Sequence, residues 1–258
     1  MASIPEMAAL AAGACLAGAM NAIAGGGTIV TFPLLVSFGM PAIQANATSA
    51  TALLIGISGS LFGYRREIPA AKPWIRLFGP VSIIGGFIGA WLLTRTSEKV
   101  FDELVPFLLL FATILFLAGN AIAKWAGFDG NPAASHPAHK AAAVALQFGV
   151  AVYGGYFGAG IGILMLAALT LIGHQKIAQM NAIKTVLGAL INVVAAAYFV
   201  WCGLVAWPQA AVMTVGAGIG YYAGARLGTG IPPEAVRRMI VAIGLLLSGV
   251  FFWRTFIA

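Results

Sequence analysis

The sequence predicts an all-α, polytopic membrane protein that is built from two inverted repeats. Of its 258 residues, 61% are hydrophobic and 8% are charged, and the mean hydropathy is +0.97. A soluble domain carries about 25% charged residues. No charged residue occurs from Met7 to Tyr64, and a helix needs only about 20 apolar residues to cross a bilayer. The chain lacks the short alternating segments of a transmembrane β-barrel, so we expect spanning helices.

The formal net charge of +7 does not indicate a nucleic-acid partner. The basic residues lie at the ends of apolar segments, where they orient a membrane protein. Cys15 and Cys202 are far apart and form no metal motif. We therefore expect both cysteines to be packing residues without a disulfide. The first residues show no basic region or cleavage site, so we expect no removed signal peptide.

The two halves of the chain resemble each other when the sequence is shifted by 135 residues, which carries Gly25 onto Gly160. At this shift three stretches match in the same order: "GGG" at 25–27 with "GIG" at 160–162, "QANA" at 44–47 with "QMNA" at 179–182, and "GGFIGAWL" at 85–92 with "GYYAGARL" at 220–227. Such self-similarity indicates a duplication. We expect repeats over 1–123 and 141–258, joined by a cytoplasmic linker at 124–140.

Each half contains five hydrophobic segments. In the first half we expect them at 7–24, 28–38, 42–64, 77–94 and 104–123. In the second half we expect them at 141–157, 161–173, 177–201, 208–226 and 236–256. The second segment of each half is too short to cross about 30 Å of hydrocarbon at about 1.5 Å per residue. These short segments predict Gly-broken helices, re-entrant or discontinuous, near the membrane midplane.

Charge in the loops predicts that the halves have opposite orientations. Loop 65–76 carries four basic residues against one acid, which places it in the cytoplasm, whereas the matching loop 202–208 is uncharged. Loops 95–103 and 226–238 show the reverse difference. An odd number of segments per repeat requires the same inversion. Inverted repeats with broken helices are typical of secondary transporters, whose substrate site lies between the repeats.

Glycines mark the two breaks, at 25–27 and at 158–162. The helix that follows a break begins with unpaired N–H groups and a positive dipole end, which favour an anion. Thr28 can add a hydroxyl, and Asn21 and Tyr156 occupy matching positions before the breaks. The alternative is that the glycines only allow close helix packing. We expect that packing role for Gly85, Gly89, Gly220 and Gly224.

Lys184 lies some eight residues inside an otherwise apolar segment. An intramembrane lysine is costly and is a functional candidate by default; the alternative is that it extends to the cytoplasmic surface. Asn192 lies about two turns further along the same face. The third segments carry further polar residues, which are either ligands or interhelical hydrogen-bonding groups: Asn46, Thr48, Ser49 and Asn181.

No Asp or Glu falls inside an expected span, so a relay of buried carboxylates is not available. An anion that leaves a negatively charged cell gains about 2.3 kcal/mol per charge per 100 mV. Anion export therefore needs no coupling ion. The membrane segments also lack a catalytic constellation. We expect neither an enzyme, nor catalytic residues, nor a metal site, nor a cofactor.

The stretch "AGGGTIVTFPLLVSFGMPAIQANATSATALL" and its second copy "GGYFGAGIGILMLAALTLIGHQKIAQMNAIKT" resemble the TauE/SafE family of sulfite exporter-like permeases along the whole chain. The resemblance implies transport of small sulfur oxyanions or organosulfonates across a bacterial inner membrane. It implies a substrate region at Gly25, Gly26, Gly27, Asn46, Thr48, Ser49, Gly160, Gly162, Asn181 and Lys184. The copies differ where Pro33 matches Ala168 and Ser49 matches Lys184, so the two halves of this region are not equivalent.

Together these observations predict a multi-pass transporter of the bacterial inner membrane that exports a sulfur-containing anion such as sulfite or sulfoacetate. Its partners are the small anion, the bilayer and, if it dimerises, a second copy. The alternatives are a permease for another small anion, a membrane assembly factor, or an enzyme acting on a lipid phosphate. The complete set of candidate site residues adds Asn21, Thr28, Tyr156 and Asn192 to those that the resemblance implies.

Overall fold

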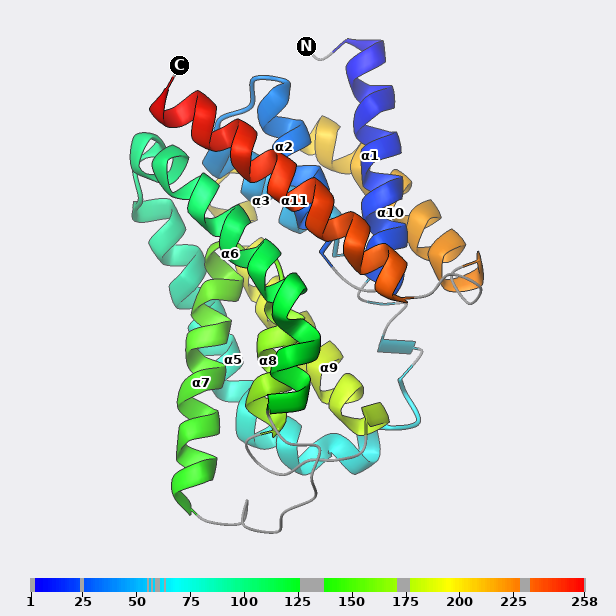
Figure 1. Cartoon of the computed structure of the whole chain (residues 1–258), viewed down its shortest axis with the longest axis vertical. Coiled ribbons are helices and arrows are strands. Elements are labelled where there is room, and N and C mark those ends of the chain that lie inside the picture. Colours follow the sequence, from blue (N-terminus) through cyan, green and yellow to red (C-terminus); the bar gives the residue numbers. More distant parts are fainter. Residues whose placement is uncertain are drawn as a thin grey trace.

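The computed structural model of the chain describes residues 3–23, 26–54, 56, 58, 61–62, 64–125, 137–170, 177–227 and 233–257. Its elements are helices throughout this part of the chain (Figure 1). The first half contains α1 (Ile4–Ile23), α2 (Thr28–Ser37), α3 (Ala42–Ala52), α5 (Ile68–Arg95) and α6 (Glu98–Trp125). The second half contains α7 (Pro137–Tyr156), α8 (Ile161–Thr170), α9 (Ile177–Trp201), α10 (Trp207–Leu227) and α11 (Pro233–Phe256). The all-helical prediction is confirmed.

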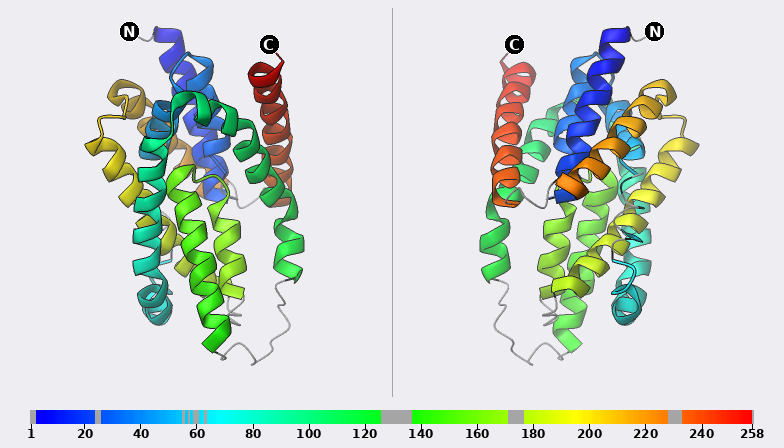
Figure 2. Two further views of the ribbon diagram at one scale, coloured as in Figure 1. Left: turned by 90° about the vertical axis from the view of Figure 1, so that its left-hand side faces the viewer. Right: turned by 90° about the vertical axis from the view of Figure 1, so that its right-hand side faces the viewer.

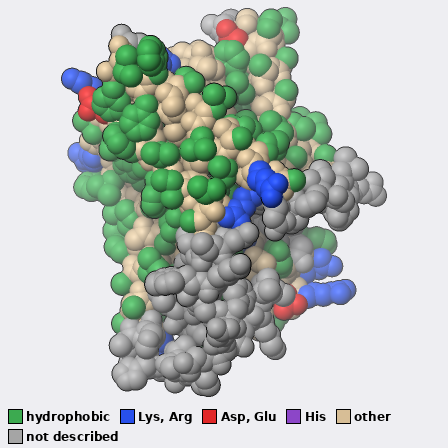
Figure 3. Space-filling model, in the orientation of Figure 1, with side chains coloured by type: hydrophobic (Ala, Val, Ile, Leu, Met, Phe, Trp, Pro, Cys, Tyr) green, Lys and Arg blue, Asp and Glu red, His purple; other side chains and the backbone are tan. Residues whose placement is uncertain are grey.

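Five of the described helices are long and apolar enough to cross a membrane; they lie in α1, α5, α6, α9 and α11. Large apolar side chains on their outer faces are exposed, among them Phe107 of α6 and Leu246 of α11. Figure 3 shows hydrophobic side chains over much of the upper part of one face. Lipid accommodates such a surface, whereas a soluble monomer rarely exposes large contiguous apolar patches. The chain is therefore a multi-pass membrane protein.

Several helices begin earlier than the apolar segments predicted. The expected loop 65–76 is helical from Ile68, so that Lys72 and Arg76 lie on α5. In Figure 1 the first part of α5 crosses the lower end of the molecule before the helix turns upward. Pro73 and Pro80 lie inside α5, and proline removes a helical hydrogen bond and bends the axis. Hydropathy detects only the part of a helix that is apolar, so it misses charged helical ends.

Arg237 lies in α11, within the segment expected at 236–256 and at the end of the loop expected at 226–238. Its guanidinium donates to the carbonyl oxygen of Phe116 and, at 2.7 Å, to that of Leu117, both in α6. A residue that we expected only to orient the chain therefore ties α11 to α6.

The third segment of the first half is shorter than the single helix expected at 42–64. Helix α3 ends at Ala52, and Leu53 and Leu54 form a turn. A Cβ at Gly56 would lie 1.8 Å from the ring of Tyr221 in α10, so only a glycine fits beneath that ring. Hydropathy cannot detect this contact, because Tyr221 lies on a helix far along the chain.

The beginning of α3 depends on an acidic residue from a distant helix. The Ile43 N–H donates to Glu98 Oε2 at 3.2 Å, and Glu98 is the first residue of α6. A carboxylate at a helix N-terminus satisfies a backbone donor and interacts favourably with the helix dipole. Glu98 thus fixes α3 against the start of α6.

Corresponding helices of the two halves run in opposite directions. In Figure 1, α1 descends from the N-terminus and α2 turns back upward, whereas α7 ascends and α8 turns back downward. Figure 2 shows α6 running from the upper to the lower end while α11 rises toward the C-terminus. The ends of α1 and α7 and the starts of α2 and α8 therefore meet in the interior.

The packing of helices joins the halves. Helix α1 packs along α10, and α7 packs along α5; α6 packs against α11. The contacts of α1 with α10 and of α7 with α5 each join the first helix of one half to the fourth helix of the other. Glycine allows these two pairs to pack closely. A Cβ on Gly89 would lie 2.0 Å from the carbonyl oxygen of Val152, and one on Gly220 would lie 1.9 Å from that of Cys15. Gly85 and Gly224 make similar approaches, which confirms the packing role expected for these four glycines.

Candidate functional site

A cavity of about 430 Å³ lies where the ends of α1 and α7 meet the starts of α2 and α8. Residues of α1, α2 and α3 line it from the first half, and residues of α7, α8 and α9 line it from the second. Its volume falls within the range of small-molecule sites, which is about 300–1,000 Å³. The fold thus forms an internal site of the right size for a small ligand.

Most of the predicted site residues line this cavity. Those that do are Asn21, Gly26, Thr28, Asn46, Gly160, Gly162, Asn181, Lys184 and Asn192. Among the described lining residues, Lys184 is the one that carries a charge, and none is Asp or Glu. Lys184 is therefore the described lining residue best suited to face an anion.

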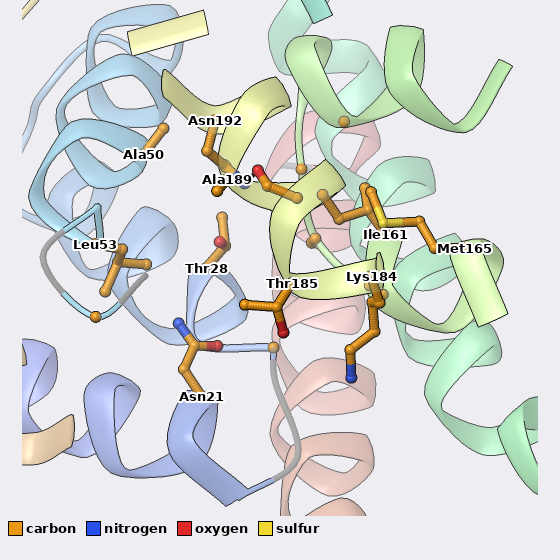
Figure 4. A pocket seen from close by; sticks show the side chains of 18 of the residues that line it. Asn21, Thr28, Ala50, Leu53, Ile161, Met165, Lys184, Thr185, Ala189 and Asn192 are labelled. Carbon is orange, nitrogen blue, oxygen red and sulfur yellow. Dashed lines mark hydrogen bonds between the residues drawn. The ribbon is translucent and has the colours of Figure 1, made fainter. Parts of the chain in front are cut away.

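Lys184 projects from α9 beside the start of α8. Its stem passes Gly162 closely: a Cβ built on Gly162 would lie 3.3 Å from Lys184 Cδ and 4.0 Å from Cε. The ammonium group has no hydrogen bond or ion pair within the described part of the chain. In Figure 4 the ends of the Lys184 and Thr185 side chains point to the same side of the cavity, where Asn21 also lies. Lys184 therefore faces the cavity, in contrast to a lysine that extends to the membrane surface.

The N-terminus of α2 is largely satisfied by the protein itself. The Gly27 N–H donates to Asn21 Oδ1 at 2.7 Å, and the Ile29 N–H donates to the Gly26 carbonyl at 3.0 Å. The Val30 N–H likewise donates to the Gly27 carbonyl. We expected several N–H groups at the start of α2 to be open to an anion. That expectation is wrong for α2, because Asn21 Oδ1 and the carbonyl oxygens of Gly26 and Gly27 already accept hydrogen bonds from these N–H groups.

The N-terminus of α8 is different. The Ile163 N–H donates to the Gly160 carbonyl at 3.1 Å, while the N–H groups of Ile161 and Gly162 have no partner among the described residues. Gly158 and Gly160 adopt φ angles of +81° and +77°, a region that glycine enters readily. The two glycines thus turn the chain so that α8 begins at the cavity, next to Lys184.

Asn46 is held by the other half of the protein. Its Nδ2 donates to the carbonyl oxygen of Tyr156 at 3.0 Å, at the end of α7. The side chain is 1% exposed, and its Oδ1 has no hydrogen-bond partner in the described structure. The Tyr156 hydroxyl lies 3.2 Å from Thr96 Oγ1, and Tyr156 is absent from the cavity lining that the structure describes.

Four other candidates lie away from the cavity or outside the described residues. Gly27 is absent from the cavity lining that the structure describes. Ser49 Oγ lies 2.6 Å from Thr31 Oγ1 and joins α3 to α2. Thr48 Oγ1 accepts the Ala206 N–H at 3.1 Å and ties α3 to the loop before α10. Both side chains are buried, as expected of the interhelical alternative. Gly25 lies outside the described residues.

Three polar residues that sequence reasoning missed also line the cavity: Tyr64, Thr185 and Tyr221. Thr185 lies next to Lys184 on α9 and has no hydrogen-bond partner among the described residues. Tyr221 of α10 accepts a hydrogen bond from Asn21 Nδ2 at 2.8 Å. Thr185 could have been found, since it follows Lys184 in a polar patch of an apolar segment. Tyr221 could not, because its position depends on the packing of α10 against α1.

The lining draws on matching positions of the two halves. At the shift of 135 residues, both members of each of these pairs contact the cavity: Ala22 and Phe157, Gly26 and Ile161, Thr28 and Ile163, Asn46 and Asn181, Ala50 and Thr185, Leu53 and Gly188, and Tyr64 and Phe199. The backbone positions correspond, but the side chains differ in every pair except Asn46 and Asn181. Thr185 and Lys184 make the second half the more polar and the positively charged side.

The apolar spans and the cavity, which both polar and apolar residues line, define the class of this protein: a multi-pass helical membrane protein with a cavity of small-molecule size. The family model described as "Sulfite exporter TauE/SafE" matches residues 10–252. The chain belongs to this family, as its motifs predicted. No solved structure matches this chain.

Relatives from three bacteria are similar over most of their lengths. A "Probable membrane transporter protein" of Haemophilus influenzae is 28% identical over 238 residues, which cover 89% of this chain and 88% of the relative. "Probable membrane transporter protein YfcA" of Escherichia coli K12 is 29% identical over 242 residues, with coverage of 91% and 85%. "Probable membrane transporter protein ORF9" of a Sinorhizobium species is 26% identical over 243 residues, with coverage of 94% and 90%. The similarity identifies a multi-pass bacterial membrane protein of a transporter family.

Proposed function

We propose that this protein is a secondary permease that exports a small sulfur-containing anion, sulfite or an organosulfonate, across the inner membrane. The observation that carries the proposal is Lys184, the charged residue of the described cavity lining, which lacks a protein partner. A charge at membrane depth is costly unless it is paired or solvated. An anion in the cavity would provide that pairing.

The groups around Lys184 suit an anion that accepts several hydrogen bonds. Thr28, Asn181 and Thr185 line the cavity, and their side chains have no hydrogen-bond partner in the described structure. The open N–H groups of Ile161 and Gly162 add the positive end of the α8 dipole. Tetrahedral sulfur oxyanions present several acceptor oxygens to such donors. The description of the family as sulfite exporters favours this ligand class.

The arrangement of helices favours alternating access by inverted repeats. Corresponding helices run in opposite directions, the first helix of each half packs on the fourth helix of the other, and matching positions line the cavity. In inverted-repeat transporters one repeat rocks against the other around a central site. We propose that 1–123 and 141–258 are these repeats and that 124–140 links them.

A permease for another small organic or inorganic anion is the second candidate, because Lys184 and hydroxyl donors do not by themselves select sulfur. A carboxylate would meet the same charge and the same donors. The relatives are named as transporters without a substrate, so the choice between sulfur oxyanions and other anions must come from binding measurements.

The test is a thermal-shift screen of the purified protein against sulfite, sulfate, thiosulfate, taurine, sulfoacetate and simple carboxylates. We expect a sulfur oxyanion or sulfonate to raise Tm selectively, because a ligand that binds the folded state stabilises it. The Lys184→Met variant keeps the apolar stem and removes the charge, and it should lose this shift. Lys72→Met, on an exposed part of α5, is the matched control and should retain it. Equal shifts for Lys184→Met and the wild type would remove Lys184 from the site.

A further inference from the structure

A chain of hydrogen bonds runs from the backbone at the start of α2 to the wall of the cavity. The Gly27 N–H donates to Asn21 Oδ1 at 2.7 Å, and Asn21 Nδ2 donates to the Tyr221 hydroxyl oxygen at 2.8 Å. Asn21 and Tyr221 both line the cavity. Because Asn21 belongs to α1 and Tyr221 to α10, the chain joins the two halves of the protein at the site.

The partners of Asn21 determine the direction of these hydrogen bonds. The Gly27 N–H can only donate, so the amide atom next to it is the oxygen, and the amide nitrogen faces Tyr221. That nitrogen also only donates, so the Tyr221 hydroxyl accepts from Asn21. The hydroxyl hydrogen of Tyr221 must then point away from Asn21. Among the described residues no group accepts this hydrogen.

The Tyr221 side chain is held in place at the cavity without being fully enclosed by protein. Its ring packs directly on a glycine, since a Cβ at Gly56 would lie 1.8 Å from the ring. The residue is partly exposed and lines the cavity. Figure 4 shows Asn21, its hydrogen-bond partner, on the side of the cavity toward which Lys184 and Thr185 point. The hydroxyl therefore lies at the part of the cavity that carries the charge.

The chemistry that Tyr221 offers differs from that of the other open polar groups in the lining. Thr28, Asn181 and Thr185 can each donate or accept, so they suit ligand groups of either kind. Tyr221 already accepts from Asn21, and its unused hydrogen is a donor. An oriented donor near Lys184 suits an anionic oxygen, because hydrogen bonds to charged acceptors are the stronger ones.

We propose that Tyr221 is a ligand-binding residue that donates its hydroxyl hydrogen to an oxygen of the bound anion, and that Asn21 is a positioning residue that orients this donor. The inference rests on the proposed anion-binding function and deepens it. Asn21, a candidate from the sequence, acts on the ligand through Tyr221. The Gly27 N–H, which we expected to meet the anion, instead orients the amide that holds the donor.

The Tyr221→Phe variant tests the donor. Phenylalanine keeps the ring that packs on Gly56, so we expect the variant to fold with a slightly lower Tm, because Asn21 Nδ2 loses its acceptor. Calorimetric titration of the full-length protein in detergent uses sulfite, sulfoacetate and acetate in parallel. We expect any of these that the wild type binds to bind about tenfold more weakly to the variant, as loss of a hydrogen bond to a charged group predicts. Tyr222→Phe, at the next position of α10 and 62% exposed, is the control and should keep the wild-type affinity.

The Asn21→Ala variant tests the positioning role. In the wild-type background it leaves the phenol hydroxyl free to turn, and we expect about three- to fivefold weaker binding of the same probe. In the Tyr221→Phe background it should change the affinity little, because no hydroxyl remains to be oriented. A double-mutant cycle measures this dependence. If Asn21 bound the anion itself, the two losses would add.

The outcomes separate the inference from the proposed function. Equal affinity of Tyr221→Phe and the wild type for a bound probe would overturn the donor role of Tyr221 while leaving an anion site. Additive losses in the cycle would overturn the positioning role of Asn21. If Tyr221→Phe does not fold, Asn21→Ala remains decisive, since unchanged affinity there would overturn the inference. A wild type that binds none of the three probes would instead overturn the proposed function.

Discussion

Gly162 shows how a single hydrogen atom in place of a methyl group shapes the cavity. Its φ lies outside the left-handed region, so alanine can adopt the backbone, but the added Cβ would lie 3.3 Å from Lys184 Cδ. That contact is closer than an ordinary van der Waals separation of about 3.5–4.0 Å. The flexible lysine stem, and with it the ammonium group, must then move.

We expect Gly162→Ala to fold with a nearly unchanged Tm and to bind the selected anion about five- to tenfold more weakly, a cost of about 1 kcal/mol. Calorimetric titration of the purified variant measures this loss. Gly188→Ala is the control, since a Cβ there would meet nothing within 4 Å although Gly188 also lines the cavity. Unchanged affinity in Gly162→Ala would show that the position of the Lys184 stem does not matter.

At the scale of elements, the closest contacts join the first helix of one half to the fourth helix of the other. Gly89 and Gly220 bring the backbones of these pairs together. Without a hydrophobic force between helices in lipid, such close packing is a main source of association. The same contacts join α1 to α10 and α7 to α5, so both halves depend on them.

We expect Gly89→Ala and Gly220→Ala to lower Tm, because the methyl group would overlap a backbone carbonyl and force the helices apart, at about 1–3 kcal/mol each. Gly149→Ala is the matched control on α7: a Cβ there meets nothing within 4 Å, so Tm should stay the same or rise. Thermal unfolding in detergent measures all three. Equal behaviour of the three variants would contradict the packing role.

At the scale of the whole molecule, the distribution of charge predicts how transport is driven. The described lining of the cavity offers Lys184 and no carboxylate or histidine. Without a titratable acid there, we propose that the anion moves without a coupled proton. For the proposed permease we expect the membrane potential to drive export of the anion.

We expect a potential of 100 mV across proteoliposomes to shift the equilibrium distribution of a transported monoanion by about 50-fold, since the corresponding free energy is about 2.3 kcal/mol. A potassium gradient with valinomycin sets the potential, and anion efflux is measured. An imposed pH gradient at zero potential is the control and should leave the distribution unchanged. Accumulation driven by the pH gradient alone would contradict uncoupled export.

Much of the molecule can be predicted from local sequence. Long apolar segments determine the spanning helices, because the hydrocarbon imposes a length and requires internal backbone hydrogen bonds. The isolated charge of Lys184 marked this residue as a candidate, and the matching positions of Asn46 and Asn181 in the two halves marked those two residues. All three residues line the cavity. The family motifs were also recognised correctly.

Tertiary structure alone decided which polar side chains face the cavity and which join helices. Ser49 bonds Thr31, and Thr48 bonds the Ala206 N–H, although both looked like candidates beside Asn46 in the sequence. Tyr221 reaches Asn21 across 200 positions of the chain and covers Gly56. Hydropathy and periodicity describe a helix by itself. The direction and partner of each polar group depend on which distant helix packs against it.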